Sequence, residues 1–186
     1  MIIDTHTHFY DPSRPQGIPW PEQDDETLPH RALPEDYKAL AVPEGVTGTI
    51  MVECSPWLED NQWVLDLAAQ DPFIVGLVGH LEPDDPDFAG QIARFAADPV
   101  FRGIRARLDP SADHGLAAAA MLIEQDLQLD TGMHESVPTL AAHFPELRIV
   151  INHCGGIPID GQAPNPEKLD LKRKAAAHPQ VYCKVS

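Results

Sequence analysis

Two histidines close to the N-terminus, His6 and His8, are separated by a single residue. Side chains alternate between the two faces of a β-strand, so a strand over residues 2–8 would place both imidazoles on one face together with Asp4. Their α-carbons would lie roughly 6.6 Å apart, a span that two imidazoles can close around one ion at about 2.0–2.1 Å. The pair predicts a shared metal or catalytic site, with two partly exposed histidines on an edge strand as the alternative.

Several apolar, β-branched runs along the chain predict buried strands that must position these and other polar groups. The runs cover residues 46–53, 73–79, 101–108, 127–131, 147–152 and 181–185. Helical patterns with their start signals lie between them, at 34–40, 59–70, 88–96, 116–125, 137–144 and 167–177. A proline-rich and acidic stretch at 9–34 separates the first strand from the first helix, and a functional loop of this length would be a lid.

Strands that alternate with helices imply βαβ units and a parallel sheet, either doubly wound or closed as a (β/α)8 barrel. No G-x-G-x-x-G or Walker A sequence follows a strand, which weakens the nucleotide-binding, doubly wound alternative. Further chemically capable side chains sit at or just after predicted strand ends, namely Glu53, His80, Asp130 and His153. A barrel keeps its active site at that end of its strands, so we expect a single TIM-type barrel domain over residues 1–186, with about seven strands and no eighth βα unit.

Charge and cysteine content limit the partners and the compartment. A formal net charge of −16 repels phosphate backbones and anionic lipid surfaces, which disfavours nucleic-acid and membrane partners and leaves small molecules. No apolar run is long enough for a membrane span, and Asp4 and His6 interrupt any signal-peptide core. Three cysteines without a C-x-x-C pair argue against a disulfide framework, so we expect a cytoplasmic protein.

Three stretches together carry a family resemblance. They read DTHTHFYDP at 4–12, RGIR at 102–105 and INHCGG at 151–156, and the segment 53–105 agrees with them. The chain resembles the amidohydrolase superfamily. More narrowly, it is similar to the amidohydrolase-related group that includes 2-pyrone-4,6-dicarboxylate lactonase and sugar-acid lactonases.

The resemblance implies a distorted (β/α)8 barrel in which His6, His8 and His153 face a divalent metal, zinc first among the candidates, or contact the substrate directly. Three histidines can hold zinc with a fourth position open for water. The family also places an aspartate, the general base, at the end of strand eight. Since the chain ends in its seventh strand, Asp130 and Glu53 are the nearest substitutes by position.

Three residues are expected to contact the substrate: Arg105, Trp57 and Glu53. An Arg105 side chain facing the barrel interior needs an anionic partner, because burying an unpaired guanidinium is costly. A substrate carboxylate would supply one, and an internal salt bridge to Glu53 or Asp130 is the alternative. Trp57, just past the second strand, would form a wall of the pocket or serve in packing.

The resemblance points to a hydrolase that opens a lactone, or cleaves another C–O or C–N bond, in a small carboxylated substrate. The lactonase branch contains members that work without a metal, so the metal-free alternative stays open. Decarboxylases of the same superfamily use a similar histidine set and form a second alternative. An inactive, truncated fragment is the third, because a barrel typically needs about 250 residues.

Overall fold

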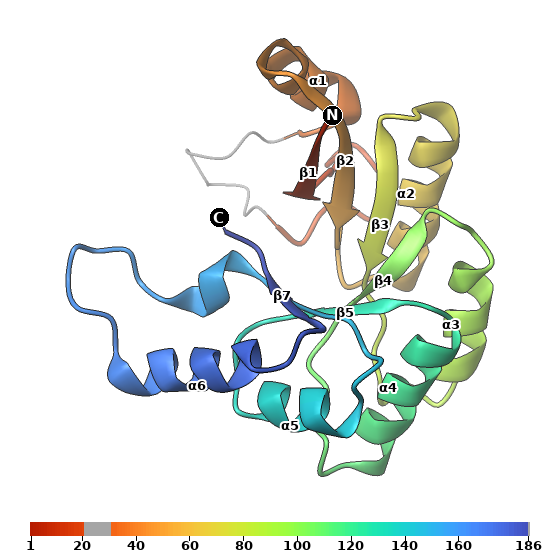
Figure 1. The fold of residues 1–186 in the computed structure, drawn as a ribbon. Helices are drawn as coiled ribbons and strands as arrows, with labels where there is room; N and C mark the ends of the chain where they lie inside the picture. Colours follow the sequence, from red (N-terminus) through yellow and green to blue (C-terminus); the bar gives the residue numbers. More distant parts are fainter. Residues whose placement is uncertain (21–30, 186) are drawn as a thin grey trace. The chain divides into compact units, whose positions relative to one another are not determined.

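The computed structural model describes residues 1–20 and 31–185, in two compact units (Figure 1). The first unit comprises Met1–His80 and Ala97–Arg102, and the second comprises Leu81–Ala96 and Gly103–Ser186. Part of the expected lid, at 21–30, lies outside the described residues.

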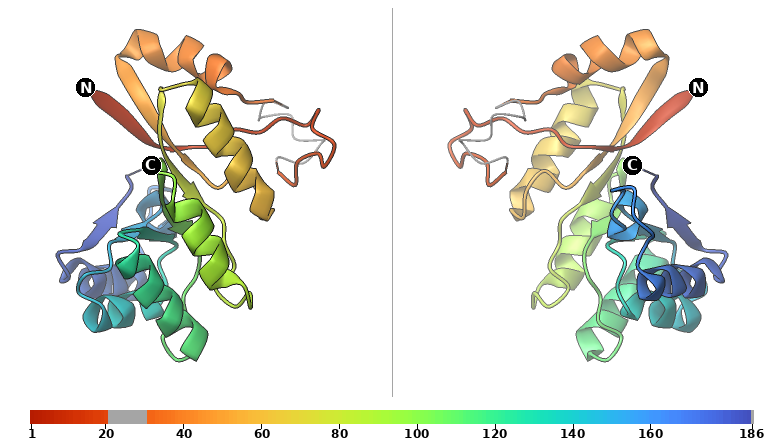
Figure 2. Two further views of the ribbon diagram at one scale, coloured as in Figure 1. Left: turned by 90° about the vertical axis from the view of Figure 1, so that its right-hand side faces the viewer. Right: turned by 90° about the vertical axis from the view of Figure 1, so that its left-hand side faces the viewer.

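The first unit contains three parallel strands, in the order β1 (Ile2–Thr7), β2 (Val46–Val52) and β3 (Ile74–Gly79). Helix α1 (Pro34–Ala41) and the 3-10 turn η1 (Val42–Glu44) lead into β2, and α2 (Leu58–Gln70) connects β2 to β3. Figure 2 shows α2 lying along this sheet, where its apolar stripe is buried. The stripe consists of Val64, Leu65 and Ala68.

The second unit repeats the same strand–helix alternation. Its elements are α3 (Phe88–Ala96), β4 (Phe101–Arg105, whose first two residues belong to the first unit), α4 (Asp113–Glu124), β5 (Gln128–Thr131), α5 (Ser136–His143), β6 (Ile149–Ile151), the turn η2 (His153–Gly156), α6 (Pro166–Ala176) and β7 (Val181–Cys183). Strands β4 to β7 pair in chain order and all run parallel. Helices α4 to α6 lie on one side of these strands (Figure 1). Large fully buried side chains fill this layer, among them Leu122, Leu129, Leu140, Leu147 and Ile149.

Successive parallel strands joined by helices are the repeat of a TIM-type barrel, so the predicted incomplete barrel with seven strands is confirmed. Every predicted helix and strand is present, and most boundaries agree within three residues. Strand β4 ends at Arg105, earlier than expected, so Arg107 lies beyond it. No helix formed by the described residues is long and apolar enough to cross a membrane.

Candidate active site

The two N-terminal imidazoles converge, as the His-x-His spacing predicts. The ring centroids of His6 and His8 lie 5.0 Å apart, with their planes inclined by 72°. The supporting strand is less regular than expected: the β1–β2 register shifts between Asp4 and Thr7, and His8 follows the last residue of β1. The rings meet even though β1 departs from strict two-residue alternation.

Backbone carbonyls of β2 fix the tautomer of His8. Its Nδ1 atom lies 2.6 Å from the carbonyl oxygen of Val52 and 3.1 Å from that of Glu53. A carbonyl oxygen only accepts hydrogen bonds, so Nδ1 carries the proton and donates it. In the neutral ring the lone pair is then on Nε2. Metal-binding histidines commonly donate their other ring nitrogen in this way, so His8 fits a metal ligand.

Asp4 braces the histidine strand. One carboxylate oxygen accepts a hydrogen bond from the Tyr37 hydroxyl at 2.6 Å, and the other accepts from the backbone N–H of His6 at 2.9 Å. Burial, followed by this contact with Asp4, raises the pKa of Tyr37 above its usual range. The carboxylate thus fastens α1 to β1 and holds the backbone of His6 in place.

Glu53 follows β2 and adopts a backbone φ of +34°, which is unusual for a residue with a side chain. Its carbonyl accepts from His8, as described above, and its carboxylate lies 2.7 Å from Nδ1 of His80. One residue therefore orients two imidazoles, one through its backbone and one through its side chain. Strained backbone of this kind is concentrated at functional sites.

In the sequence, His80 follows a predicted strand but matches no motif. In the folded unit, its position is tightly controlled. The Asn61 side chain accepts from the His80 backbone N–H at 3.0 Å and donates to its carbonyl at 2.8 Å. A Cβ atom on the preceding Gly79 would lie 2.3 Å from the Asn61 amide oxygen, so only glycine permits this clamp. The sequence offered one signal for this contact, which was the position of His80. His80 directly follows β3, just as Glu53 directly follows β2. The ends of these two strands are neighbours, because Val52 pairs with Val78.

The loop after β1 is anchored on α2 by a buried ion pair. Arg14 donates to the Asp60 carboxylate at 2.5 Å, and its guanidinium stacks 4.2 Å from the ring centroid of Trp63. Ser55 donates to the other Asp60 oxygen at 2.5 Å. Burial alone would raise the pKa of Asp60, but the hydrogen bonds from Arg14 and Ser55 outweigh it and lower that pKa.

In the second unit, Asp130 is engaged in an ion pair. Its fully buried carboxylate lies 2.5 Å from Nζ of Lys184, which is 8% exposed, and accepts a second hydrogen bond from Gln128 at 2.7 Å. Arg105, half-buried at the end of β4, is the register partner of Asp130. Lys184 is thus an ionic partner of Asp130 that the sequence pattern did not indicate. Both Asp130 oxygens are occupied, which does not favour a role as general base.

His153 begins a left-handed turn. Positive φ angles run through four consecutive residues, from His153 (+49°) to Gly156 (+66°). Left-handed backbone costs a residue with a side chain roughly 1–2 kcal/mol, so His153 and Cys154 are held there by their surroundings. The Cys154 N–H donates to the Lys184 carbonyl at 2.8 Å, and Lys172 donates to the Cys154 carbonyl at 2.7 Å. The His153 side chain is exposed.

His134 forms a local hydrogen-bonded network. Thr131 and Ser136 contact its Nε2 and Nδ1 atoms at 2.9 and 2.6 Å, and Ser136 also donates to the Leu108 carbonyl at 3.0 Å. Burial, and then the charge of Arg107, lower the pKa of His134. Its contacts are those of a neutral histidine that stabilises the loop after β5.

The sequence-predicted site residues fall into two groups. His6, His8, Glu53 and Trp57 lie in the first unit, and Arg105, Asp130 and His153 lie in the second. Trp57 precedes α2, is 36% exposed and donates its backbone N–H to Ser55. Within residues 1–20 and 31–185, no group of three His, Cys, Asp or Glu side chains is arranged to hold a metal ion.

Known proteins resemble this chain over its whole length. It is 32% identical to L-fucono-1,5-lactonase of Burkholderia ambifaria, over 99% of this chain and 67% of that protein. A zinc-bound amidohydrolase structure from Burkholderia multivorans matches with a TM-score of 0.84 and 22% identity, over 100% of this chain and 69% of the other.

A citrate-bound structure from Acinetobacter baumannii, described as a probable 2-pyrone-4,6-dicarboxylic acid hydrolase, matches with a TM-score of 0.72 and 18% identity, over 100% and 70% of the two chains. The amidohydrolase family model matches residues 3–186. With the barrel repeat and the convergent histidine pair, these matches show that the chain belongs to the amidohydrolase family of hydrolases.

Proposed function

We propose that this protein hydrolyses the lactone of a small sugar acid. The observation that carries the proposal is the histidine pair at the end of β1, in which carbonyl oxygens hold the His8 tautomer with Nε2 as the acceptor atom. The resemblance to L-fucono-1,5-lactonase over 99% of the chain supports a sugar-acid lactone as the substrate.

In this reaction, water adds to the lactone carbonyl carbon and the bond from that carbon to the ring oxygen breaks. The ring oxygen takes up a proton and leaves as a hydroxyl of the open-chain acid. We assign polarisation of the carbonyl oxygen to a metal ion that His6, His8 and His153 would hold or, without one, to N–H groups of these rings. Arg105 is assigned to a carboxylate or other electron-rich group of the substrate, and Trp57 to the wall of the pocket.

The proton acceptor in this proposal is the Glu53–His80 pair. A carboxylate bound to Nδ1 of an imidazole leaves Nε2 as the basic atom, the arrangement that activates nucleophiles in many hydrolases. His80 would take a proton from the attacking water and return one to the leaving oxygen. Asp130 is assigned a supporting role, because Lys184 and Gln128 occupy its carboxylate.

The proton transfer is tested with His80→Gln and Glu53→Gln. General acid–base catalysis typically contributes about 10²–10⁴-fold, so we expect His80→Gln to lower kcat by at least about 10²-fold. Glu53→Gln keeps a hydrogen-bonding side chain and should lose less. Circular dichroism checks that both variants fold. A kcat within twofold of wild type in His80→Gln would exclude the pair as the proton acceptor.

The metal part of the proposal concerns His6, His8 and His153 as ligands. A bound zinc ion would supply Lewis acidity toward the carbonyl oxygen. Metal analysis of the purified protein should find zinc, and chelation should lower both zinc content and activity. A metal-free protein with full activity would leave carbonyl polarisation to the histidines alone.

Hydrolysis itself is tested with L-fucono-1,5-lactone, other aldonolactones and 2-pyrone-4,6-dicarboxylate. Ring opening releases a proton at neutral pH, so a weakly buffered indicator assay measures the rate above spontaneous hydrolysis. We expect acid release without carbon dioxide, and at least a 10²-fold loss in His8→Ala. Leu40→Ala, at a 77% exposed position on α1, is the control. Carbon dioxide release would instead indicate a decarboxylase.

We also propose that the reaction takes place in the cytoplasm. The odd number of cysteines, without a C-x-x-C pair, is typical of a reducing compartment and supports this placement. A fusion of the protein to a reporter that fluoresces only in the cytoplasm tests the proposal.

A further inference from the structure

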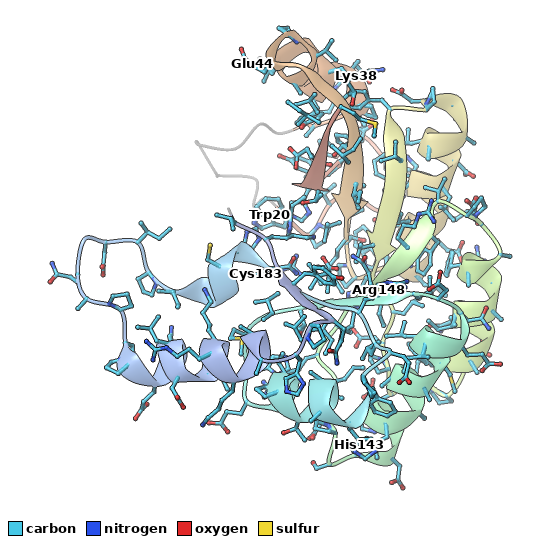
Figure 3. All side chains as sticks on the ribbon, viewed as in Figure 1. Trp20, Lys38, Glu44, His143, Arg148 and Cys183 are labelled. Carbon is cyan, nitrogen blue, oxygen red and sulfur yellow. The ribbon has the colours of Figure 1, made fainter. Side chains whose placement is uncertain are left out.

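Trp20, which is labelled in Figure 3, belongs to the loop after β1, and its ring lies against that of His8. Its ring centroid is 5.8 Å from that of His8, with the planes inclined by 66°, and 5.9 Å from that of Tyr10. Tyr10 is buried, whereas Trp20 is 47% exposed. A large aromatic side chain therefore presents open surface directly beside an imidazole.

Several contacts hold the loop that carries Trp20. Tyr10 and Ala32 form an isolated antiparallel bridge, with N···O distances of 2.8 and 3.0 Å. Arg14 is fixed to Asp60, as described above. Gly17 has a φ of +70° and its N–H donates to the Arg14 carbonyl at 2.8 Å, which turns the chain toward Trp20. The loop that carries the indole is thus anchored to helix α2 and, through Tyr10, to Ala32.

The surroundings of Trp20 indicate the kind of ligand that would cover it. An indole face attracts C–H groups, and the face of a sugar ring presents C–H groups while its hydroxyls lie at the ring edge. Glu53, whose carbonyl contacts the His8 ring and whose carboxylate lies 2.7 Å from Nδ1 of His80, adds an acidic residue to this strand end, which does not favour an anionic group. A neutral ring with C–H faces and hydroxyl edges fits these conditions.

We infer that Trp20 is the stacking wall for the sugar ring of the substrate and sets a preference for polyhydroxylated lactones over unsubstituted ones. This inference rests on the proposed function, and it moves to Trp20 the wall that was assigned to Trp57 above. The loop that follows β1 supplies this aromatic face beside His8.

Substrate selectivity gives the first test. Aromatic contacts are worth enough to change affinity by about 2- to 12-fold, so Trp20→Ala should raise KM for L-fucono-1,5-lactone by that factor. Its KM for δ-valerolactone, which has no hydroxyl groups, should stay within twofold of wild type. Trp20→Phe keeps an aromatic face and should recover part of the loss, and Leu40→Ala should change neither value. Equal changes for both lactones would overturn the inference.

Ligand binding gives a test that does not require turnover. Titration with L-fucose, a neutral sugar ring that is not a lactone, should quench the tryptophan fluorescence of the wild-type protein and leave that of Trp20→Phe unchanged. A full quench in Trp20→Phe would assign the contact to Trp57 or Trp63 and overturn the inference. If no lactone is hydrolysed but the Trp20-dependent quench is present, the proposed function fails while the sugar-binding wall stands.

Discussion

The buried ion pair between Asp130 and Lys184 should dominate the response of the second unit to substitution. Lys184→Met leaves a fully buried carboxylate that Gln128 still contacts, and Asp130→Asn removes the carboxylate from a lysine side chain that is 8% exposed. Breaking a buried pair by removing one partner typically costs about 3–5 kcal/mol. For a chain of this size, that loss corresponds to a fall in Tm of roughly 6–20 °C.

The double variant Asp130→Leu/Lys184→Met separates two explanations of such a loss. Replacing both charges with apolar side chains removes the desolvation cost together with the attraction, so its stability should return to within about 2 kcal/mol of wild type. If the single variants were instead destabilised by poor packing, the double variant would be no better than either. Circular dichroism at 222 nm during heating measures all three.

The exposed pair Lys174–Asp170 on α6 is a matched control for ionic contact without burial. Its atoms lie 2.8 Å apart, but both side chains are more than half exposed. Solvent screens such pairs, so Lys174→Met should change Tm by less than about 2 °C. A shift below about 3 °C in Lys184→Met would refute the reasoning, because the buried pair would then behave like the exposed one.

Three further predictions concern pH and thiol chemistry. Because the pKa of Asp60 is lowered in the fold, its contribution to stability is complete above about pH 4 and is lost at lower pH. The Tm difference between wild type and Arg14→Met should therefore narrow in acid. A constant Tm difference from pH 7 to 2.5 would contradict this. The lowered pKa of His134 means that protonation opposes folding. Wild-type Tm should therefore fall as pH drops below about 6.5, and fall less in His134→Gln. Burial raises the pKa of Cys54 to about 12, so at pH 8 iodoacetamide should label the exposed Cys183 before Cys54. Mass spectrometry of the peptides measures the two labelling rates. Equal labelling would count against a buried Cys54 thiol.

Local patterns were sufficient to predict the secondary structure. Apolar β-branched runs and helical stripes located the elements. Residues two positions apart share one face of a strand, and residues three or four apart share one face of a helix, so burial of that face gives a local apolar pattern. Their alternation then implied the parallel barrel repeat. The His-x-His spacing likewise predicted two convergent imidazoles, and they converge in spite of the register shift in β1.

Contacts between distant residues were beyond the reach of those patterns. The partner of Asp130 is 54 positions away, and the carbonyls that fix the His8 tautomer are 44 and 45 positions away. His80 carried no motif, and its importance follows from Glu53 and Asn61, which meet it only in the folded unit. The positive φ angles of Glu53 and His153 were equally hidden, because such angles are uncommon for any residue other than glycine.

The sequence by itself determined which segments become strands and helices, and which histidine pair meets at the end of β1. Only the tertiary structure decided which polar and aromatic contacts form in each unit: Glu53 between His8 and His80, Lys184 on Asp130, and Trp20 against His8. The physical reason is that periodicity encodes the burial of neighbouring positions, whereas hydrogen bonds and ring contacts depend on directions that are set once distant strands and loops have packed together.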